Sequence, residues 1–563
     1  MKKKLTSQSR VLYCAYTLFV FLIVLAGCKA KTQDTNNSPL VLDMVHHNPG
    51  EEPYTTSFNK PEFSKKIGYN GKVYFLFESP ALAINWESLS SDILPKGSED
   101  REWVDAKAAQ IRQMHIACRE QNMDIYAMSD LVLFPKCLIE KYNIAETFGN
   151  PQDSLTQRLL RIQIAEIFDQ FPDLNGLVVR IGETYLHDAP YHKGNIKQRN
   201  NPENTIIPLM NLLREEICVK RDKELIFRTW RAFDKNANSY QTINDAVEPH
   251  KNLTISIKHC EGDFHRANPF SKIIGQGRHK QIIEVQCARE YEGKGAYPNY
   301  IANGVIEGFE EHASMPEEKI NSIREFTEKR PDLYAGIWTW SRGGGWGGPY
   351  TKNEMWYELN AWVMAKWAND PTQSEEAIFN QYAIEELHLA PTEVPKFRSL
   401  CLLSAKAVVR GRNSTHRDMS PWWTRDAGIG WPQPSTIVDA QKQQRNLAQK
   451  DESIEIWKEI VQLAEQISWP DDETRTHVIG SSKYGLHLYE IYRSLVYLAG
   501  AEEKNDTVAI KQWIAEYDTA WENYAKLPGM YPQVATLYAK DYTRHIKTPS
   551  DFKVNELRAQ IGM

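Results

Sequence analysis

Two stretches decide the fold: NLTISIKHCEGDF from Asn252 to Phe264, and KQIIEVQCAREYEG from Lys280 to Gly293. Each begins with a short run of apolar and β-branched residues, which is typical of a buried strand, and each ends in charged residues. The first run places Lys258 before Asp263, and the second places Arg289 beside Glu290. If the two strands are neighbours in one sheet, both carboxylates lie at the same edge, where a (β/α)8 barrel carries its chemistry.

The same kind of run occurs eight times along the first 340 residues, and helical patterns lie between the runs. Alternation of strand and helix repeated eight times predicts an α/β fold, a closed parallel (β/α)8 TIM barrel. A ninth apolar run, Gly304–Phe309, is assigned to the connection after the seventh strand. The expected strands are Leu40–Val45, Val73–Phe77, Asp124–Met128, Leu177–Ile181, Leu225–Trp230, Leu253–Lys258, Ile282–Cys287 and Tyr334–Trp340.

From about Asn353 onward only helical patterns follow one another, so the barrel is expected to be followed by an all-α C-terminal domain. The predicted division is residues 39–352 for the barrel and 353–563 for the helical domain. The connection from Gly411 to Pro434 is rich in Trp, Pro and Gly. It is expected either to fold over the barrel mouth or to pack the two domains together.

The N-terminus reads as a targeting segment. Lys2, Lys3 and Lys4 precede an apolar run, and small residues lead into Cys28. This pattern resembles a bacterial lipoprotein signal, residues 1–28, whose Cys28 becomes lipidated, followed by a polar tether at 29–38. It predicts an exported lipoprotein anchored to a membrane, periplasmic or at the cell surface. A plain uncleaved anchor is the alternative.

Composition narrows the class of ligand. A formal charge of -6 and the absence of a basic stripe make nucleic acid a poor candidate partner. With 16 Trp and 26 Tyr the chain is rich in flat amphipathic rings that suit a carbohydrate site, although a large core uses such rings too. The widely spaced cysteines read as small buried residues, and no cofactor or metal is expected, because histidines such as His46 and His47 are not spaced as ligands.

A third acid follows the fourth expected strand, where Arg180-Ile181-Gly182 leads to Glu183. Three acids at the ends of strands four, six and seven, namely Glu183, Asp263 and Glu290, would converge on one barrel mouth. One acid that protonates a leaving oxygen, facing carboxylates that activate a water, is the requirement of glycoside hydrolysis. A structural ion-pair network with Lys258 and Arg289 is the alternative for Asp263 and Glu290.

These residues, together with Trp230-Arg231-Ala232-Phe233 at the end of strand five, resemble the glycoside hydrolase family 67 α-glucuronidases. Against that family this chain lacks an N-terminal β-domain and carries Val179 where the family has a lysine. The resemblance implies an inverting enzyme that removes terminal α-linked glucuronic or 4-O-methylglucuronic acid from plant-type, xylan-derived oligosaccharides. It would make Glu183 the general acid, and Asp263 and Glu290 the carboxylates that position and activate the water.

The resemblance also implies that Arg231 and Lys258 hold the uronate of the substrate. Arg180, Arg289, Trp230 and Trp340 stand at or near other strand ends and complete the expected substrate-binding set. Arg231 is the best single partner for a carboxylate, since its planar fork can bind it bidentately. A homodimer formed through the helical domain is a further hypothesis.

Three other functions stay open. A surface glycan-binding lipoprotein without catalysis fits the anchor and the aromatic residues. A uronate lyase would need a base such as Tyr185 or His187. A hydrolase of another uronide or of a neutral sugar would use the same acids.

Overall fold

The computed structural model describes residues 38–48, 55–181, 186, 188–194, 201–230, 237–314, 320–415, 427–432, 440–544 and 546–563. The lipidation candidate Cys28, the acid candidate Glu183 and the uronate-binding candidate Arg231 lie outside these residues, as do Tyr185, His187, Trp422 and Trp423. Residues Leu40–Met563 form one compact unit. Within the described part of the chain, no helix has the length and apolar character needed to cross a membrane.

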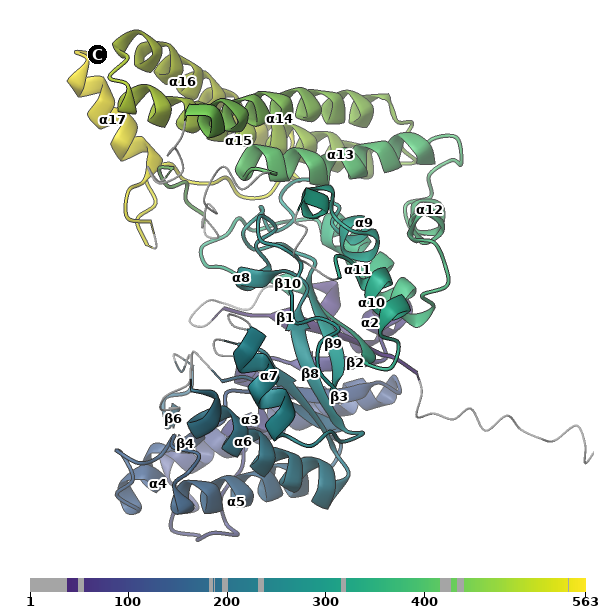
Figure 1. Ribbon diagram of the computed structural model, residues 1–563, viewed down its shortest axis with the longest axis vertical. Coiled ribbons are helices and arrows are strands. Elements are labelled where there is room, and N and C mark those ends of the chain that lie inside the picture. Colours follow the sequence, from purple (N-terminus) through teal and green to yellow (C-terminus); the bar gives the residue numbers. More distant parts are fainter. Residues whose placement is uncertain are drawn as a thin grey trace, which may run out of the picture. The chain divides into compact units, whose positions relative to one another are not determined.

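Eight parallel strands close into a barrel in the order β1-β10-β9-β8-β7-β5-β3-β2 (Figure 1). The two deciding stretches are indeed neighbours, because β8 pairs with β9 so that Lys258 lies opposite Glu284. The fold prediction is confirmed. The barrel strands are β1 Leu40–His46, β2 Gly71–Tyr74, β3 Asp124–Ser129, β5 Gly176–Val179, β7 Glu224–Arg228, β8 Leu253–Lys258, β9 Lys280–Gln286 and β10 Tyr334–Gly343.

The expected strands match these eight, with small differences at their ends. The second is shorter than expected, because residues Leu76–Glu78 turn into a 3-10 helix, η2. The ninth apolar run forms a helix, α9 (Ala302–Glu307), and it lies in the connection after the seventh strand, as expected. A small antiparallel pair, β4 (Leu133–Pro135) with β6 (His192–Gly194), was not expected.

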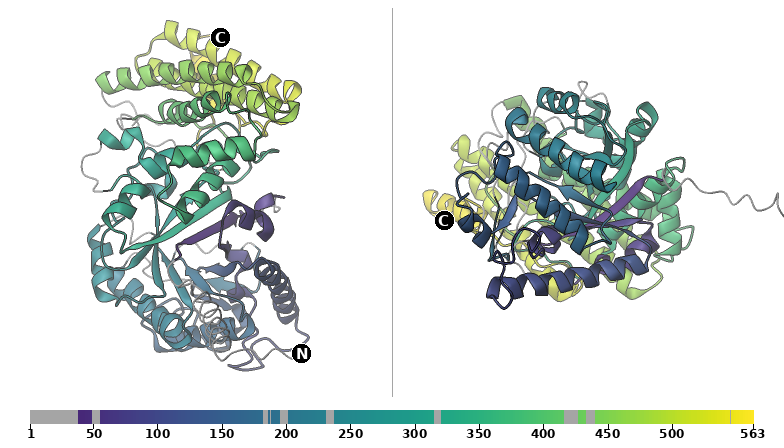
Figure 2. Two further views of the ribbon diagram at one scale, coloured as in Figure 1. Left: turned by 90° about the vertical axis from the view of Figure 1, so that its right-hand side faces the viewer. Right: turned by 90° about the horizontal axis from the view of Figure 1, so that it is seen from below.

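Helices lie in the connections and surround the strands, as the right-hand view of Figure 2 shows. The apolar faces of these helices are buried, for example Val104, Ala108 and Ile111 of α3. The connection from β8 to β9 contains only the four-residue α8 (Glu261–Phe264). The connecting helices are α2 Pro61–Ile67, α3 Glu99–Glu120, α4 Lys136–Lys141, α5 Ser154–Gln170, α6 Ile207–Leu213, α7 Ala237–Ala246, α9 Ala302–Glu307 and α10 Ile323–Lys329.

Alternate residues of the strands fill the barrel interior with an apolar cluster that includes Leu42, Met128 and Trp338. A buried ion pair lies within it: Arg228 on β7 donates from Nε and Nη2 to the two carboxylate oxygens of Glu284 on β9, at 2.7 Å each. Ser256 on β8 donates to the same carboxylate at 2.7 Å. The guanidinium also lies 5.2 and 5.0 Å from the ring centroids of Trp338 and Trp340.

After the barrel the chain is helical. The helices are α11 Met355–Asn369, α12 Glu375–Glu385, α13 Val394–Arg412, α14 Ala440–Gln466, α15 Asp472–Glu503, α16 Thr507–Met530 and α17 Ser550–Gln560. In Figure 1 the long helices α13 to α16 lie alongside one another. Of the connection Gly411–Pro434, the described residues 427–432 bond to residues 539–550, and Trp431 donates its backbone N–H to the carbonyl of Thr548 at 2.9 Å. Whether the connection covers the mouth or packs the two domains together stays a prediction.

The barrel and the helices share buried contacts within the one compact unit. Tyr297, from the loop after β9, lies 3.1 Å from the hydroxyl of Tyr489 on α15. The N–H of Tyr300 donates to the hydroxyl of Ser404 on α13 at 3.1 Å. The expected boundary between residues 352 and 353 falls between β10 and α11, and the division into two domains stays a prediction. The six described cysteines are free, and five of them are buried, as expected.

Barrel closure depends on a glycine. A methyl group on Gly336, whose φ is +139°, would lie 1.9 Å from the carbonyl oxygen of Leu40 on β1. We expect Gly336→Ala to destabilise the protein by about 4 kcal/mol or more, because the clash is with backbone and β1 must separate from β10. Urea unfolding followed by fluorescence measures the loss.

The matched control is Gly97→Ala. Gly97 also has a positive φ, +84°, but a methyl group there meets no atom within 4 Å. Gly97→Ala should lower the free energy of unfolding only by the cost of the backbone strain, about 1–2 kcal/mol. Equal losses in the two variants would show that closure does not limit stability.

Candidate active site

The candidate site is the mouth of the barrel, at the C-terminal ends of the strands. Because side chains alternate along a strand, the residue two positions after each interior residue also points inward. Lys258 follows the interior Ser256 in this way, and Trp340 follows Trp338. The two-residue period of a strand is therefore enough to place Lys258 and Trp340 at the same mouth.

Asp263 is held by an unusual backbone. Gly262, Asp263 and Phe264 all have φ near +64°, so the chain turns back into the mouth directly after β8. This turn buries Phe264, whose ring lies 5.3 Å from that of Trp340. It also brings the Asp263 carboxylate onto the ammonium of Lys258. This is the ion pair that the sequence left open as the structural alternative, whereas the resemblance had assigned Lys258 to the uronate of the substrate.

The environment keeps Asp263 ionised. Burial opposes ionisation, but the charge and hydrogen bond of Lys258 and the hydroxyl of Tyr291, which donates at 3.0 Å, lower the pKa of Asp263 to about 2. Lys258 in turn lies 4.1 Å from the ring centroid of Trp230, a cation–π contact. At neutral pH Asp263 is therefore a fixed negative charge and a weak base.

Glu290 lies in the loop after β9, next to Tyr291, which bridges to Asp263. It is 4% exposed, and its backbone N–H donates to the side-chain oxygen of Gln286 at 3.0 Å. A methyl group on Gly344 would lie 2.8 Å from its Cβ and 3.0 Å from its Oε2. The loops after β8 and β9 thus bring the two predicted carboxylates to the same side of the mouth.

Arg289 contacts a different acid from the one expected. Its Nε and Nη2 donate to the two carboxylate oxygens of Glu292, at 3.0 and 2.9 Å, and both residues are buried. Although burial opposes ionisation, this arginine lowers the pKa of Glu292 to about 2. The sequence treated Arg289 as a substrate-binding residue or a partner of Glu290. The observed pair is within one loop, and Glu292 was not singled out.

Arg180 is paired as well. Its Nε and Nη2 donate to the two oxygens of Asp130, at 2.7 and 2.6 Å, and both residues are buried. Asp130 follows β3 and was missed in the sequence. The signal that could have found it is its position in the sequence. Asp130 comes two residues after the third expected strand, just as Glu183 comes two residues after the fourth.

His46 is a further residue of the mouth that the sequence did not predict. It is the last residue of β1, one beyond the expected strand end, and its ring centroid lies 4.3 Å from that of Phe75 and 5.1 Å from that of Trp340. Burial, with the charges of Arg180, His47 and Arg228, lowers its pKa well below the usual value for histidine. A neutral imidazole therefore forms part of the wall of the mouth.

No group of three or more His, Cys, Asp or Glu side chains in the described part of the chain is arranged to hold a metal ion. The expected separation of roughly 6.5–9.5 Å between the acid and the water-activating carboxylates of an inverting enzyme involves Glu183, which lies outside the described residues.

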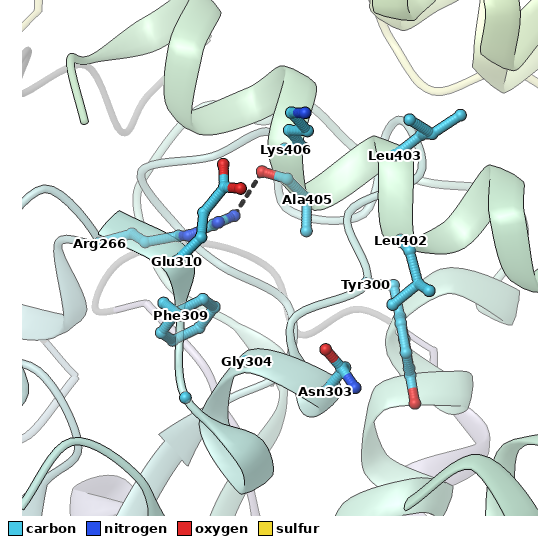
Figure 3. Close-up of a pocket in the computed structure, with 11 residues that line it drawn as sticks. Arg266, Tyr300, Asn303, Gly304, Phe309, Glu310, Leu402, Leu403, Ala405 and Lys406 are labelled. Carbon is cyan, nitrogen blue, oxygen red and sulfur yellow. Dashed lines mark hydrogen bonds between the residues drawn. The ribbon is translucent and has the colours of Figure 1, made fainter. Parts of the chain in front are cut away.

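A cavity of about 290 Å³ lies elsewhere, between α9, the segment after it and α13 (Figure 3). None of the predicted site residues lines it. Its arginine, Arg266, is already used: it pairs with Glu311 and donates to the carbonyl of Ala405, the contact dashed in Figure 3. The cavity therefore lies apart from the predicted site residues.

No protein-family model matches the chain, and no curated protein matches its sequence. Among solved structures, the chain is similar to a GH138 enzyme targeting pectin rhamnogalacturonan II. The TM-score is 0.55 and the identity 12%, over 93% of this chain and 68% of that one. It also aligns with CpGH84D at 13% identity, over 92% of this chain and 74% of that one, but a TM-score of 0.38 carries no weight. The first likeness establishes the fold: a (β/α)8 barrel with a helical C-terminal region.

Proposed function

We propose that the protein is a glycoside hydrolase that removes a terminal α-linked uronic acid, glucuronic or 4-O-methylglucuronic acid, from plant-type oligosaccharides, with inversion. One observation carries the proposal: the ionised Asp263, bonded to Lys258 and to Tyr291, lies on the same side of a closed barrel mouth as the buried Glu290. A buried acid such as Glu290 at this end of a parallel barrel is expected where a reaction needs it, because burying charge is costly.

The environments of the two carboxylates suggest different roles. A pKa of about 2 makes Asp263 a poor proton acceptor at neutral pH, since a general base works best when its pKa lies near the working pH. We assign it to orienting the water and stabilising positive charge on the sugar ring. Glu290 is then the base, and Glu183, which follows β5 in the sequence, is the acid that protonates the leaving oxygen.

The uronic-acid assignment rests on charge. Of the four expected cations, three are paired with acids: Arg180 with Asp130, Lys258 with Asp263 and Arg289 with Glu292. A substrate carboxylate needs a further cation. The resemblance to the family 67 α-glucuronidases assigns that role to Arg231, which lies outside the described residues.

A non-catalytic glycan-binding protein is the second candidate. The observation that favours it is the same pairing, because acids neutralised by neighbouring cations are also what a structural network would contain. Anchoring through a lipidated Cys28 on an exported protein, and dimerisation through the helical domain, remain predictions that accompany either function.

Release of sugar is the direct test. We expect the protein, incubated with uronic-acid-capped and neutral oligosaccharides, to release free uronic acid as the anomer inverted from the substrate, as followed by NMR at early times. Release of a neutral sugar would overturn the uronide assignment. Release of nothing from any substrate would favour the binding protein.

The division of roles predicts a dependence on the leaving group. Glu183→Gln should slow the hydrolysis of an oligosaccharide by about 10²–10⁴-fold. It should slow the hydrolysis of an activated aryl glycoside much less, since that leaving group needs no proton. Glu290→Gln should slow both substrates alike. Comparison of kcat/KM for the two substrates in each variant checks this, and parallel losses in Glu183→Gln would contradict its role as the acid.

The uronic-acid assignment predicts that substitution of Arg231 impairs turnover of a glucuronoside more than turnover of a glucoside. Loss of a charge-assisted contact costs about 1.5–3 kcal/mol, so Arg231→Ala should lower kcat/KM for a glucuronoside roughly tenfold to hundredfold and leave the matching glucoside nearly unchanged. Arg475→Ala is the matched control, because Arg475 is exposed on α15 and pairs there with Asp472. Equal losses on both sugars would remove Arg231 from carboxylate recognition.

A further inference from the structure

The loop that follows β10 carries a single side chain between its glycines. Residues 343–348 read Gly-Gly-Gly-Trp-Gly-Gly, and all five glycines have φ between +70° and +107°. These are left-handed conformations that favour glycine, so residues with a side chain would be strained at these positions. Trp346 is the one residue of this glycine loop that can contact a ligand through its side chain.

One end of the glycine loop lies against the candidate base. The hypothetical methyl group on Gly344 would lie 3.0 Å from Oε2 of Glu290 and 3.1 Å from Nε2 of Gln286. A side chain at position 344 would therefore collide with the site. Two peptide units span at most about 7.6 Å between Cα atoms, so the Cα of Trp346 lies within that distance of the Cα of Gly344.

The other end of the loop is held by the segment between α16 and α17. A methyl group on Gly347 would lie 2.8 Å from the hydroxyl of Tyr542. Tyr350 and Thr536 exchange two hydrogen bonds, at 2.7 and 3.0 Å. The carbonyl of Gly348 also accepts from the ammonium of Lys294 at 2.6 Å. The loop is thus fixed between the barrel and the C-terminal segment.

Trp346 and Tyr542 are both only partly buried. We propose that they form a stacking subsite for the sugar residues on the leaving-group side of the bond that is cut. This inference rests on the proposed function. When a terminal sugar occupies the mouth, the rest of the oligosaccharide must leave it past the surrounding loops. Aromatic rings offer apolar faces to sugar C–H groups there.

The test compares a long with a minimal leaving group. Trp346→Ala and Tyr542→Ala should each lower kcat/KM for a uronic-acid-capped oligosaccharide about tenfold, and leave the corresponding glycosyl fluoride within about twofold, because fluoride cannot reach the loop. Trp346→Phe should restore most of the loss. Trp513→Ala is the control, since Trp513 is also partly buried but stacks on Tyr497 in the helices, with ring centroids 3.9 Å apart.

A binding measurement separates this inference from the proposed function. Calorimetric titration of the unmodified protein and of Trp346→Ala with the oligosaccharide reports the subsite even if nothing is hydrolysed. Weaker binding by the variant supports the subsite. Equal losses on oligosaccharide and fluoride would mean that the loop only supports Glu290, and no loss of either turnover or binding would mean that the rings do not contact the substrate. Either result overturns the subsite.

Discussion

The ion pair between Arg228 and Glu284 is the interaction on which the rest of the barrel mouth depends. It lies in the interior, with the two side chains 1% and 0% exposed, and it joins β7 to β9 across β8. A buried pair of this kind is stable only when its geometry is good and its remaining polar atoms are satisfied. Ser256 donates a hydrogen bond to the carboxylate, and the rings of Trp338 and Trp340 lie against the guanidinium.

Each strand that contributes to this layer places its next inward residue in the mouth. Trp230 follows Arg228, Lys258 follows Ser256, and Gln286 follows Glu284. The cation–π contact of Lys258 with Trp230 and the hydrogen bond from Glu290 to Gln286 are thus built on a rigid charged layer. Rigid support of this kind is what positions catalytic groups accurately.

The strands were predictable because a parallel barrel buries both faces of each strand, so the apolar runs are short and unbroken. Which charged side chains pair with one another could not be predicted from the sequence. Arg180 and Asp130 are fifty positions apart, and only the closed barrel brings them together. Arg289 had two neighbouring acids, and the left-handed backbone at Arg289 decides that Glu292, not Glu290, faces it. Periodicity predicts which face a residue occupies, but it does not predict which partner a charge finds.

The left-handed turn at Asp263 determines how this residue should be replaced. Asparagine and aspartate tolerate a positive φ better than other residues with a side chain, since their short polar side chains bond locally. Asp263→Asn therefore changes the charge while keeping the shape and the backbone preference. Alanine at the same position would add backbone strain to the loss of charge. An alanine scan would therefore ascribe the whole effect of the substitution to the lost carboxylate, although part of it comes from the strained turn.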